Sequence, residues 1–470
     1  MKKIIILASI VAFALSAYSQ DSLSVYLELA AKNNPAVLQK LSEYQAALQK
    51  VPQSGSLPDP ELSAGIFLSP MEQMSGNQLA DLSLMQMFPW FGVLKNAKDE
   101  MSLMAKAKYE SFREAQLQVF YNVQSVWNEM YKNQQSILIS EKNLEILRTI
   151  ERLSLVRFKS APVGSSSGSS SGGTSSAGSS PASSGSSGMS GMGGGGAAAP
   201  AASGSAPMAS GSMASSGGSG LADLYRVQME IGELENNVAL LKNQQQAILA
   251  RFNSYLNRHS QTPVTLPEKM KADSLGISLA AVSDSMLTNN PMLGMLQYEQ
   301  QSLDARKQMV TRMSYPMIGL GLNYSVFNKS PMSTSPMNGD DMIMPMVKLT
   351  LPVYRKKYKA MQQETELMKT ATQQGYQATA NLLESEYYQA LQLYRDAQRR
   401  TTLYENQFQL ATRSLNILLK SFSASGSGLT DLLRIRQQVL DYELKHVEAV
   451  TDNNTAIAWL KRLMAHSPIQ

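Results

Sequence analysis

The sequence contains no cysteine, so the chain forms no disulfide, no thiolate metal site and no lipid-bearing N-terminal cysteine. Histidine is almost absent: the three residues are His259, His446 and His466, and no two of them have the spacing of metal ligands. No glycine-rich phosphate loop with a lysine opens a helix after a strand. We therefore expect neither an enzyme nor a resident cofactor.

Aromatic residues make up only 7% of the chain, which argues against several thick globular cores in 470 residues. Beyond the first 20 residues no run of 18 apolar residues occurs, so no membrane-spanning helix is expected. The formal net charge is +5, and Lys2 and Lys3 supply two of these charges. This excess is too small to indicate a nucleic-acid partner.

The N-terminus has the pattern of an export signal. Lys2 and Lys3 precede an apolar run from Ile4 to Leu15, and Ala17-Tyr18-Ser19 supplies small residues for cleavage. Residues 1–19 are therefore predicted to be a signal peptide. An N-terminal membrane anchor is disfavoured, because about 12 apolar residues are too few to cross a bilayer that needs roughly 20.

The sequence contains an internal repeat, since short motifs recur in the same order in its two halves. The matched pairs are Asn33-Asn34-Pro35 with Asn289-Asn290-Pro291, Pro60 and Gly65 with Pro316 and Gly321, Phe88-Pro89-Trp90-Phe91 with Leu351-Pro352-Val353-Tyr354, and Gly220-Leu221-Ala222-Asp223-Leu224 with Gly428-Leu429-Thr430-Asp431-Leu432. We assign residues 20–258 to the first repeat, 259–274 to a connector and 275–470 to the second repeat. Each repeat is predicted to run helix, strand, loop, strand, very long helix, break, long helix.

The long helices carry coiled-coil seams with steps of four and three. In the first repeat the seam is Val119, Val123, Val126, Met130, Asn133, Ile137, Ser140, Leu144 and Leu147. The matching positions of the second repeat are Leu383, Tyr387, Ala390, Tyr394, Ala397, Thr401, Tyr404, Phe408 and Ala411. A helix from about residue 95 to 159 is too long for a compact domain, so the predicted fold is mainly α and elongated.

Between the helices, apolar and polar residues alternate as they do in strands with two different faces. Strands are predicted at about 61–69, 79–88, 317–327 and 342–352. Ordinary hairpins on a soluble core are one interpretation. The other is a set of outer-membrane strands, apolar toward lipid and polar toward a lumen. Four strands cannot close a barrel, so this second interpretation requires several chains around a symmetry axis.

Taken together, the paired Asn-Asn-Pro starts, the Met87-Phe88-Pro89-Trp90-Phe91-Gly92 strand exit and the two Gly-Leu-x-Asp-Leu segments after the helix breaks resemble the TolC-like outer-membrane efflux factors. The resemblance covers nearly the whole mature chain. It implies a homotrimer, with one 12-stranded β-barrel in the outer membrane and a hollow α-barrel that crosses the periplasm. Such a protein is a passive duct, opened by a periplasmic adaptor and powered by an inner-membrane pump.

The resemblance also implies roles for residues at the helix breaks. The adaptor-facing tips would include Gly220, Leu221, Gly428 and Leu429, and the gate candidates are Asp223, Arg226, Asp431 and Arg434. Relatives often carry a second acidic residue where this chain has Arg434. The gate is therefore either acidic or held by Asp431–Arg434 bridges, and an (i, i+3) pair of this kind also braces its own helix.

The first helix break is much longer than the second. Phe158 to Gly220 spans 62 positions and Phe422 to Gly428 spans 6, so the first tip holds 56 extra residues. This insertion, at about 162–219, is rich in serine, glycine, alanine and proline and is predicted to be disordered.

Methionine is abundant, with 28 residues, and its positions suggest a cargo. Candidate soft-metal contacts are Met189, Met192, Met208 and Met213 in the insertion and Met332 and Met337 in the second outer loop; Met71, Met74 and Met342 in or beside the loops and Met85, Met87, Met344 and Met346 on the lumen side continue the series. Thioether sulfur suits Cu(I), which favours a copper/silver or other cation efflux channel. The alternative is that methionine is an adaptable apolar filler.

Three functions remain open from the sequence. The chain is an efflux duct for small solutes, the outer-membrane duct of a type I protein-secretion system, or a structural periplasmic coiled-coil protein. The strand alternation favours the two ducts. The genes next to this one would separate efflux from secretion.

Overall fold

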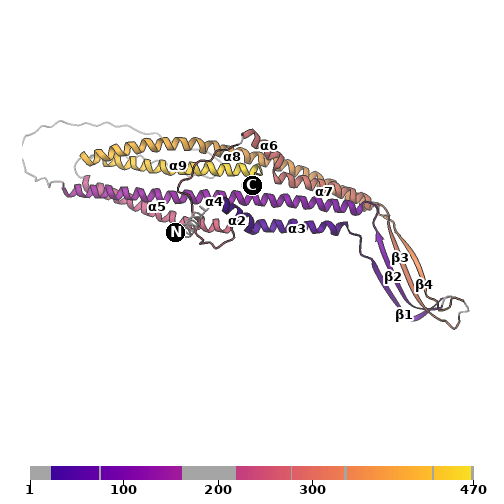
Figure 1. The fold of residues 1–470 in the computed structure, drawn as a ribbon. Helices are drawn as coiled ribbons and strands as arrows, with labels where there is room; N and C mark the ends of the chain where they lie inside the picture. The colour runs from indigo at the N-terminus through magenta and orange to yellow at the C-terminus, as the bar shows by residue number, and fades with distance from the viewer. Residues whose placement is uncertain are drawn as a thin grey trace, which may run out of the picture. The chain divides into compact units, whose positions relative to one another are not determined.

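The computed structural model describes residues 23–73, 76–160, 219–276, 278–332, 336–425 and 428–466. The predicted signal peptide and the insertion at about 162–219 therefore lie outside the described residues, apart from the last position of the insertion. The elements, labelled in Figure 1, are α2 (Leu23–Asn33), α3 (Pro35–Gly55), β1 (Glu61–Gln73), β2 (Gly76–Phe88), α4 (Val93–Ser160), α5 (Ser219–Tyr255), α6 (Leu279–Asn289), α7 (Pro291–Met313), β3 (Met317–Asn328), β4 (Met342–Thr350), α8 (Arg355–Ser425) and α9 (Leu429–Leu463). The protein is mainly helical with one small sheet, as the sequence predicts.

The element order repeats. The run α3, β1, β2, α4, α5 is followed by α7, β3, β4, α8, α9, with α2 and α6 preceding the two runs. The long helices α4 and α8 have 68 and 71 residues. Contacts divide the chain into two units, Met1–Asn143 with Asn236–Gln470, and Leu144–Glu235. Both α4 and α5 contribute residues to each unit.

Both coiled-coil seams predicted from the sequence are confirmed by burial. In α4 every seam residue is buried except Leu144, which is half-buried, and in α8 every seam residue is buried or half-buried. In the larger unit α8 and α9 run side by side (Figure 1). Burying an apolar side chain of this size contributes about 1.5–3 kcal/mol, so these seams supply much of the stability of the long helices.

The structure shows a role for the Asn-Pro motif that both repeats share. Asn34 is the N-cap of α3: its Oδ1 accepts hydrogen bonds from the backbone N–H groups of Ala36 and Val37, while its Nδ2 donates to the carbonyl of Tyr255, the last residue of α5, at 2.8 Å. One buried side chain thus satisfies orphan groups at the start of one helix and the end of another.

Asn290 does the same in the second repeat. Its Oδ1 accepts from the backbone N–H of Met292 at 2.9 Å, and its Nδ2 donates to the carbonyl of Leu463, the last residue of α9, at 3.1 Å. The proline that follows each asparagine occupies the first helical turn, where a missing N–H costs nothing. Asn34 therefore ties the end of α5 to the start of α3, and Asn290 ties the end of α9 to the start of α7.

Each repeat has its own apolar core near these helix ends. The first joins α2, α4 and α5 around Tyr26, Trp127 and Phe252, whose rings lie 5.3–5.8 Å apart. The second joins α6, α8 and α9 around Met286, Leu383 and Leu460. The duplication seen in the sequence is therefore also a duplication of packing.

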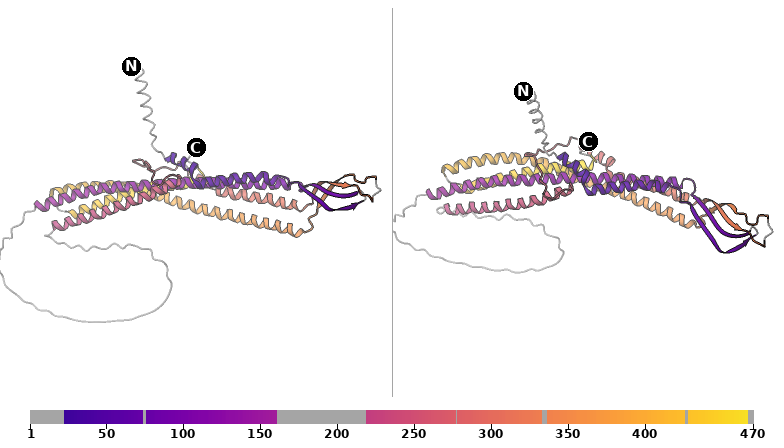
Figure 2. Two further views of the ribbon diagram at one scale, coloured as in Figure 1. Left: turned by 90° about the horizontal axis from the view of Figure 1, so that it is seen from below. Right: turned by 60° about the horizontal axis from the view of Figure 1, so that its bottom comes forward.

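The sheet is antiparallel, with strand order β1-β2-β3-β4, and Figure 2 shows its strands in two further views. The central pair, β2 with β3, joins the two repeats. The first hairpin is longer than predicted, because β1 continues to Gln73 and β2 begins at Gly76. The prediction that the first strand ends at about residue 69 and the second begins at about residue 79 is therefore wrong, since most of the residues between these positions lie in the strands.

The alternation fails at Pro70 because the register shifts between Ile66 and Met71. Such an irregularity tolerates a proline, which cannot donate to a ladder. Pairing resumes at Met71 with Gln78, so Met71 lies in a strand. The sequence pattern ends at the irregularity, whereas the strand does not.

Candidate functional site

One face of the sheet is apolar and open to its surroundings. It carries Leu62, Ala64 and Ile66 on β1, Leu82 and Leu84 on β2, Ile318, Leu320, Leu322 and Tyr324 on β3, and Ile343, Val347 and Leu349 on β4. Ile66 is 80% exposed and Val347 74% exposed. A contiguous exposed apolar face of this kind marks a surface that meets lipid or protein.

The opposite face carries polar residues and methionines. Ser63, Ser83 and Asn323 lie in one row across β1, β2 and β3, and Asp81 pairs with Ser325, whose hydroxyl lies 3.1 Å from the aspartate Oδ1. Because successive residues of a strand point to opposite faces, the two faces differ along the whole sheet.

Aromatic residues gather where β2 leaves the sheet. Trp90 stacks on Tyr315, which follows α7, with ring centroids 5.4 Å apart, and Phe91 is largely exposed. An apolar pocket of about 460 Å³ lies here, lined by Leu57, Phe88, Pro89, Trp90, Phe91, Gly92, Leu94, Ile318 and Leu320. Amphipathic rings at the end of an apolar strand face are typical of a membrane–water boundary.

Gly92 makes this turn possible. Its φ of 85° is left-handed, and a Cβ at this position would lie 2.9 Å from the Cδ of Arg312. Arg312 in turn donates from Nη1 to the carbonyl of Phe91 at 3.2 Å. The strand exit predicted from the Phe-Pro-Trp-Phe-Gly sequence is thus held against the end of α7.

The predicted tip residues of the second repeat lie together at the start of α9. Gly428 is the N-cap, with a left-handed φ of 90°, and Leu429 is buried. Asp431 and Arg434 are exposed on the first turns of α9, and among the ion pairs of the described residues none joins them. Asp431 carries the negative charge that a helix N-terminus favours.

The tip residues of the first repeat begin α5 in the smaller unit. Gly220 already lies inside the helix, Leu221 is exposed, Asp223 is half-buried and Arg226 is exposed. Leu224 and Val227 form the buried side. Within this unit α4 and α5 are joined by an ion pair between Arg148 and Glu235 at 3.0 Å and by a hydrogen bond from Gln228 to Glu151.

The methionine candidates have different outcomes. Met332 and Met337 lie in the loop between β3 and β4 and are 81% and 61% exposed. Met189, Met192, Met208 and Met213 lie outside the described residues, as does Met74. Within the described ranges no group of three or more histidine, cysteine, aspartate or glutamate side chains is placed to hold a metal ion.

A charged cluster joins the repeats and was not predicted from the sequence. Arg462 on α9 lies 3.3 Å from the carboxylate of Glu114 on α4 and 3.7 Å from that of Glu386 on α8. Trp459 donates from Nε1 to Glu386, and the guanidinium lies over the Tyr121 ring. Burial raises the pKa of Glu114 and Arg462 opposes that rise, so this cation compensates for burying the carboxylate.

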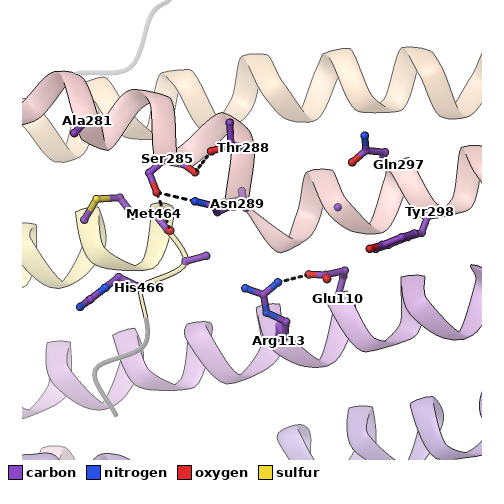
Figure 3. A pocket seen from close by; sticks show the side chains of 13 residues that line it. Glu110, Arg113, Ala281, Ser285, Thr288, Asn289, Gln297, Tyr298, Met464 and His466 are labelled. Carbon is purple, nitrogen blue, oxygen red and sulfur yellow. Dashed lines mark hydrogen bonds and ion pairs between the residues drawn. The ribbon is translucent and has the colours of Figure 1, made fainter. Parts of the chain in front are cut away.

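The polar pocket in Figure 3 lies between α4, α6, α7 and the end of α9, with a volume of about 550 Å³. Asn289 donates to Ser285 at 3.2 Å, Ser285 donates to the carbonyl of Met464 at 3.4 Å, and Arg113 pairs with Glu110 at 2.8 Å. These groups bind one another and close the ends of α6 and α9. His466 also lines the pocket, but no nucleophile, base and orienting group form a catalytic chain here.

In the part of the chain that the structure describes, every helix is too short or too polar to span a membrane.

The sequence matches no protein-family model, and no curated protein matches it. Solved structures do match over nearly the full length of the chain. The outer-membrane protein VceC from Vibrio cholerae is 12% identical, with 96% of this chain and 98% of that chain covered and a TM-score of 0.69. The open state of the outer-membrane channel MtrE from Neisseria gonorrhoeae is 13% identical, with 94% and 88% covered and a TM-score of 0.67.

A third match is CusC, whose structures concern folding and transmembrane channel formation; it is 12% identical, with 95% of this chain and 92% of that chain covered and a TM-score of 0.68. The chain therefore has the fold of the TolC-like outer-membrane channels. Fold similarity at this level of identity leaves the function to be argued from the residues.

Proposed function

We propose that this chain is one subunit of an outer-membrane channel, a passive trimeric duct that exports small solutes as part of a tripartite efflux system. The observation that carries the proposal is the sheet, which has one exposed apolar face and one polar face on a chain with the fold of such channels. An apolar face toward lipid and a polar face toward a lumen are what a membrane strand requires.

The edges of the sheet support a trimer. Among the described residues, β1 and β4 each pair with a neighbouring strand on one side only. Four strands are too few to close, and a symmetric ring that pairs β4 of each copy with β1 of the next satisfies both edges. Three copies then give a 12-stranded barrel, in agreement with the resemblance to TolC-like proteins, and the paired long helices form the periplasmic extension.

The proposed partners follow from this placement. An export signal at residues 1–19 takes the chain to the periplasm, and a periplasmic adaptor and an inner-membrane pump engage the helix tips. Gly220, Leu221, Gly428 and Leu429 form the adaptor-facing tips. Asp431 and Arg434, with Asp223 and Arg226, are the gate candidates; the exposure of Asp431 and Arg434 supports contacts with neighbouring subunits.

The proposed cargo includes soft metal cations such as Cu(I) and Ag(I), because methionine also occurs at exposed positions where an apolar filler has no core to fill. Met332 and Met337 are examples, since both are exposed on the loop between β3 and β4. The proposed channel has no catalytic step and no resident cofactor.

The exposed sheet argues against a purely structural coiled-coil protein, since such a protein has no use for an apolar strand face. A type I secretion duct remains the second candidate because it needs the same architecture. The pump encoded beside this gene separates the two: a proton-driven pump with an adaptor supports efflux, and an ABC exporter with a secreted substrate supports secretion.

Deleting the gene tests the proposed function. We expect the deletion strain to accumulate an efflux dye and to lose tolerance of copper or silver, with both restored by the intact gene. Lost secretion of a protein with unchanged dye accumulation and metal tolerance would instead identify the secretion duct. Unchanged dye efflux, metal tolerance and secretion together would contradict the proposed duct.

A further inference from the structure

The polar face of the sheet carries five methionines in a small area. They are Met85 and Met87 on β2 and Met342, Met344 and Met346 on β4. All five share the face of Ser83, Asn323 and Ser325, opposite the apolar face, so they are not part of an apolar core. An exposed polar surface is an unusual place for a residue that normally fills gaps between helices.

The strand register places methionines of β2 and β4 on either side of glycines in β3. Met85 and Met346 are both paired with Gly321 of β3, so they lie on either side of it in one row. Met87 is paired with Gly319, the next residue on the same face of β3. The Cα atoms of Met85 and Met346 are therefore about 10 Å apart, a gap that two methionine side chains reaching toward each other can bridge.

The glycines leave the space into which these side chains fold. A Cβ at Gly319 would lie 2.6 Å from the sulfur of Met87, and a Cβ at Gly321 would lie 3.2 Å from the terminal methyl of Met85. Met346 is the one residue of β4 that is half-buried, while the other residues of the strand are exposed. These contacts show that the thioether side chains of Met85 and Met87 on β2 lie over a strip of bare backbone on β3, and the register places Met346 of β4 on the other side of that strip.

The charges around this strip are mixed. Glu61 on β1 is the partner of Met85, and Asp81 lies farther along the same face, while Lys348 lies beside Gly319. The strip therefore has no strong field that would select a hard divalent ion. Thioether sulfurs are neutral and soft, and they select Cu(I) and Ag(I) without any thiolate.

We infer that Met85, Met87 and Met346 form a binding site for a soft monovalent cation, Cu(I) or Ag(I), over Gly319 and Gly321. This inference rests on the proposed function in one respect: the polar face lines a lumen only when the strands of several copies close into a barrel. The cation is a transported cargo held briefly by neutral ligands. Weak, neutral ligation suits a duct, since cargo has to leave as readily as it binds.

Methionine oxidation read by peptide mass spectrometry tests the site at single residues. The full chain, purified in detergent and chloride-free buffer, is treated with hydrogen peroxide with and without Ag(I). A sulfur bound to Ag(I) oxidises slowly, so we expect Met85, Met87 and Met346 to oxidise about tenfold more slowly with the ion. Met368, half exposed on α8, is the internal control and should be unaffected.

Two variants separate a shared site from independent sulfurs. Met346→Leu keeps the apolar volume but removes one sulfur. Losing even a residue that only orients a metal ligand lowers metal affinity about tenfold, and the loss of a ligand itself should cost at least as much. Ag(I) should therefore no longer protect Met85 and Met87. The matched variant Met313→Leu, exposed at the end of α7, should leave that protection unchanged. In Gly319→Ala every sulfur is retained but the space for Met87 is filled, so protection should also fall.

Equal oxidation of Met85 with and without Ag(I), or continued protection in Met346→Leu, would overturn the inference. Conductance of the same preparations in planar bilayers keeps the two proposals apart. Conductance without protection would contradict the cation site and support the channel. Protection without conductance would support the cation site and contradict the channel.

Discussion

Arginine in place of Leu322 on β3 is expected to remove the chain from the outer-membrane fraction. Leu322 lies in the middle of the apolar face and is about half exposed. A charged residue on the lipid face near the bilayer centre costs about 2–4 kcal/mol, and a trimer bears that cost three times. Membrane fractionation followed by gel analysis without heating measures how much folded assembly remains.

The neighbouring residue provides a matched control. Asn323 has the opposite orientation on the same strand, in a row with Ser83 and Met344. Asn323→Arg adds the same charge one position away but toward the polar face, and we expect it to be tolerated. Equal recovery of the two variants would show that the sheet has no lipid-facing side.

Replacing Arg462 by methionine is expected to destabilise the larger unit strongly. The change leaves Glu114 and Glu386 next to each other without their shared cation, and both are mostly buried. Removing one partner of a fully buried pair costs about 3–5 kcal/mol, so this partly exposed cluster should lose about 2–3 kcal/mol. Thermal unfolding of the purified protein measures the loss.

The pH dependence of that loss identifies its cause. Burial already raises the pKa of Glu114, and removing Arg462 raises it further. A carboxyl whose pKa is raised by folding destabilises the protein above that pKa and has no effect below its ordinary value, near 4.5. The difference in unfolding temperature between Arg462→Met and the native protein should therefore shrink as the pH falls toward 4.5.

Lys461→Met removes the same charge from the neighbouring position and is the control. Among the described residues Lys461 belongs to no ion pair, so its replacement should change the unfolding temperature little at any pH. A loss in Arg462→Met that stayed constant from pH 5 to pH 8 would contradict the role of the carboxylates.

The periodic features of the fold could be predicted from the sequence because they are local. The seam through Val123 and Ile137 and the alternation through Leu320 and Leu322 each follow from spacing along one element. The irregular stretch of β1 before Met71 could not be predicted, because its pairing depends on β2. The pairing of Asn34 with the end of α5 and of Asn290 with the end of α9 was visible only as a repeated motif of unknown purpose.

The contacts between distant segments were beyond the sequence. Glu114 and Arg462 lie 348 positions apart, and nothing in either neighbourhood marks them as partners. The methionines of β2 and β4 were noticed as a composition, yet their convergence over Gly319 and Gly321 depends on the strand register. The tip residues Asp431 and Arg434 were identified through the resemblance to TolC-like proteins, and their gating role stays a prediction.

Single-channel recording tests the central claim most directly. The purified protein, assembled from the full chain and inserted into a planar lipid bilayer, is expected to conduct ions with a trimer as the conducting species, and Asn323→Arg should change its ion selectivity toward anions. Failure to insert or conduct, even with a purified adaptor at the helix tips, would contradict the proposal that this chain forms an outer-membrane channel.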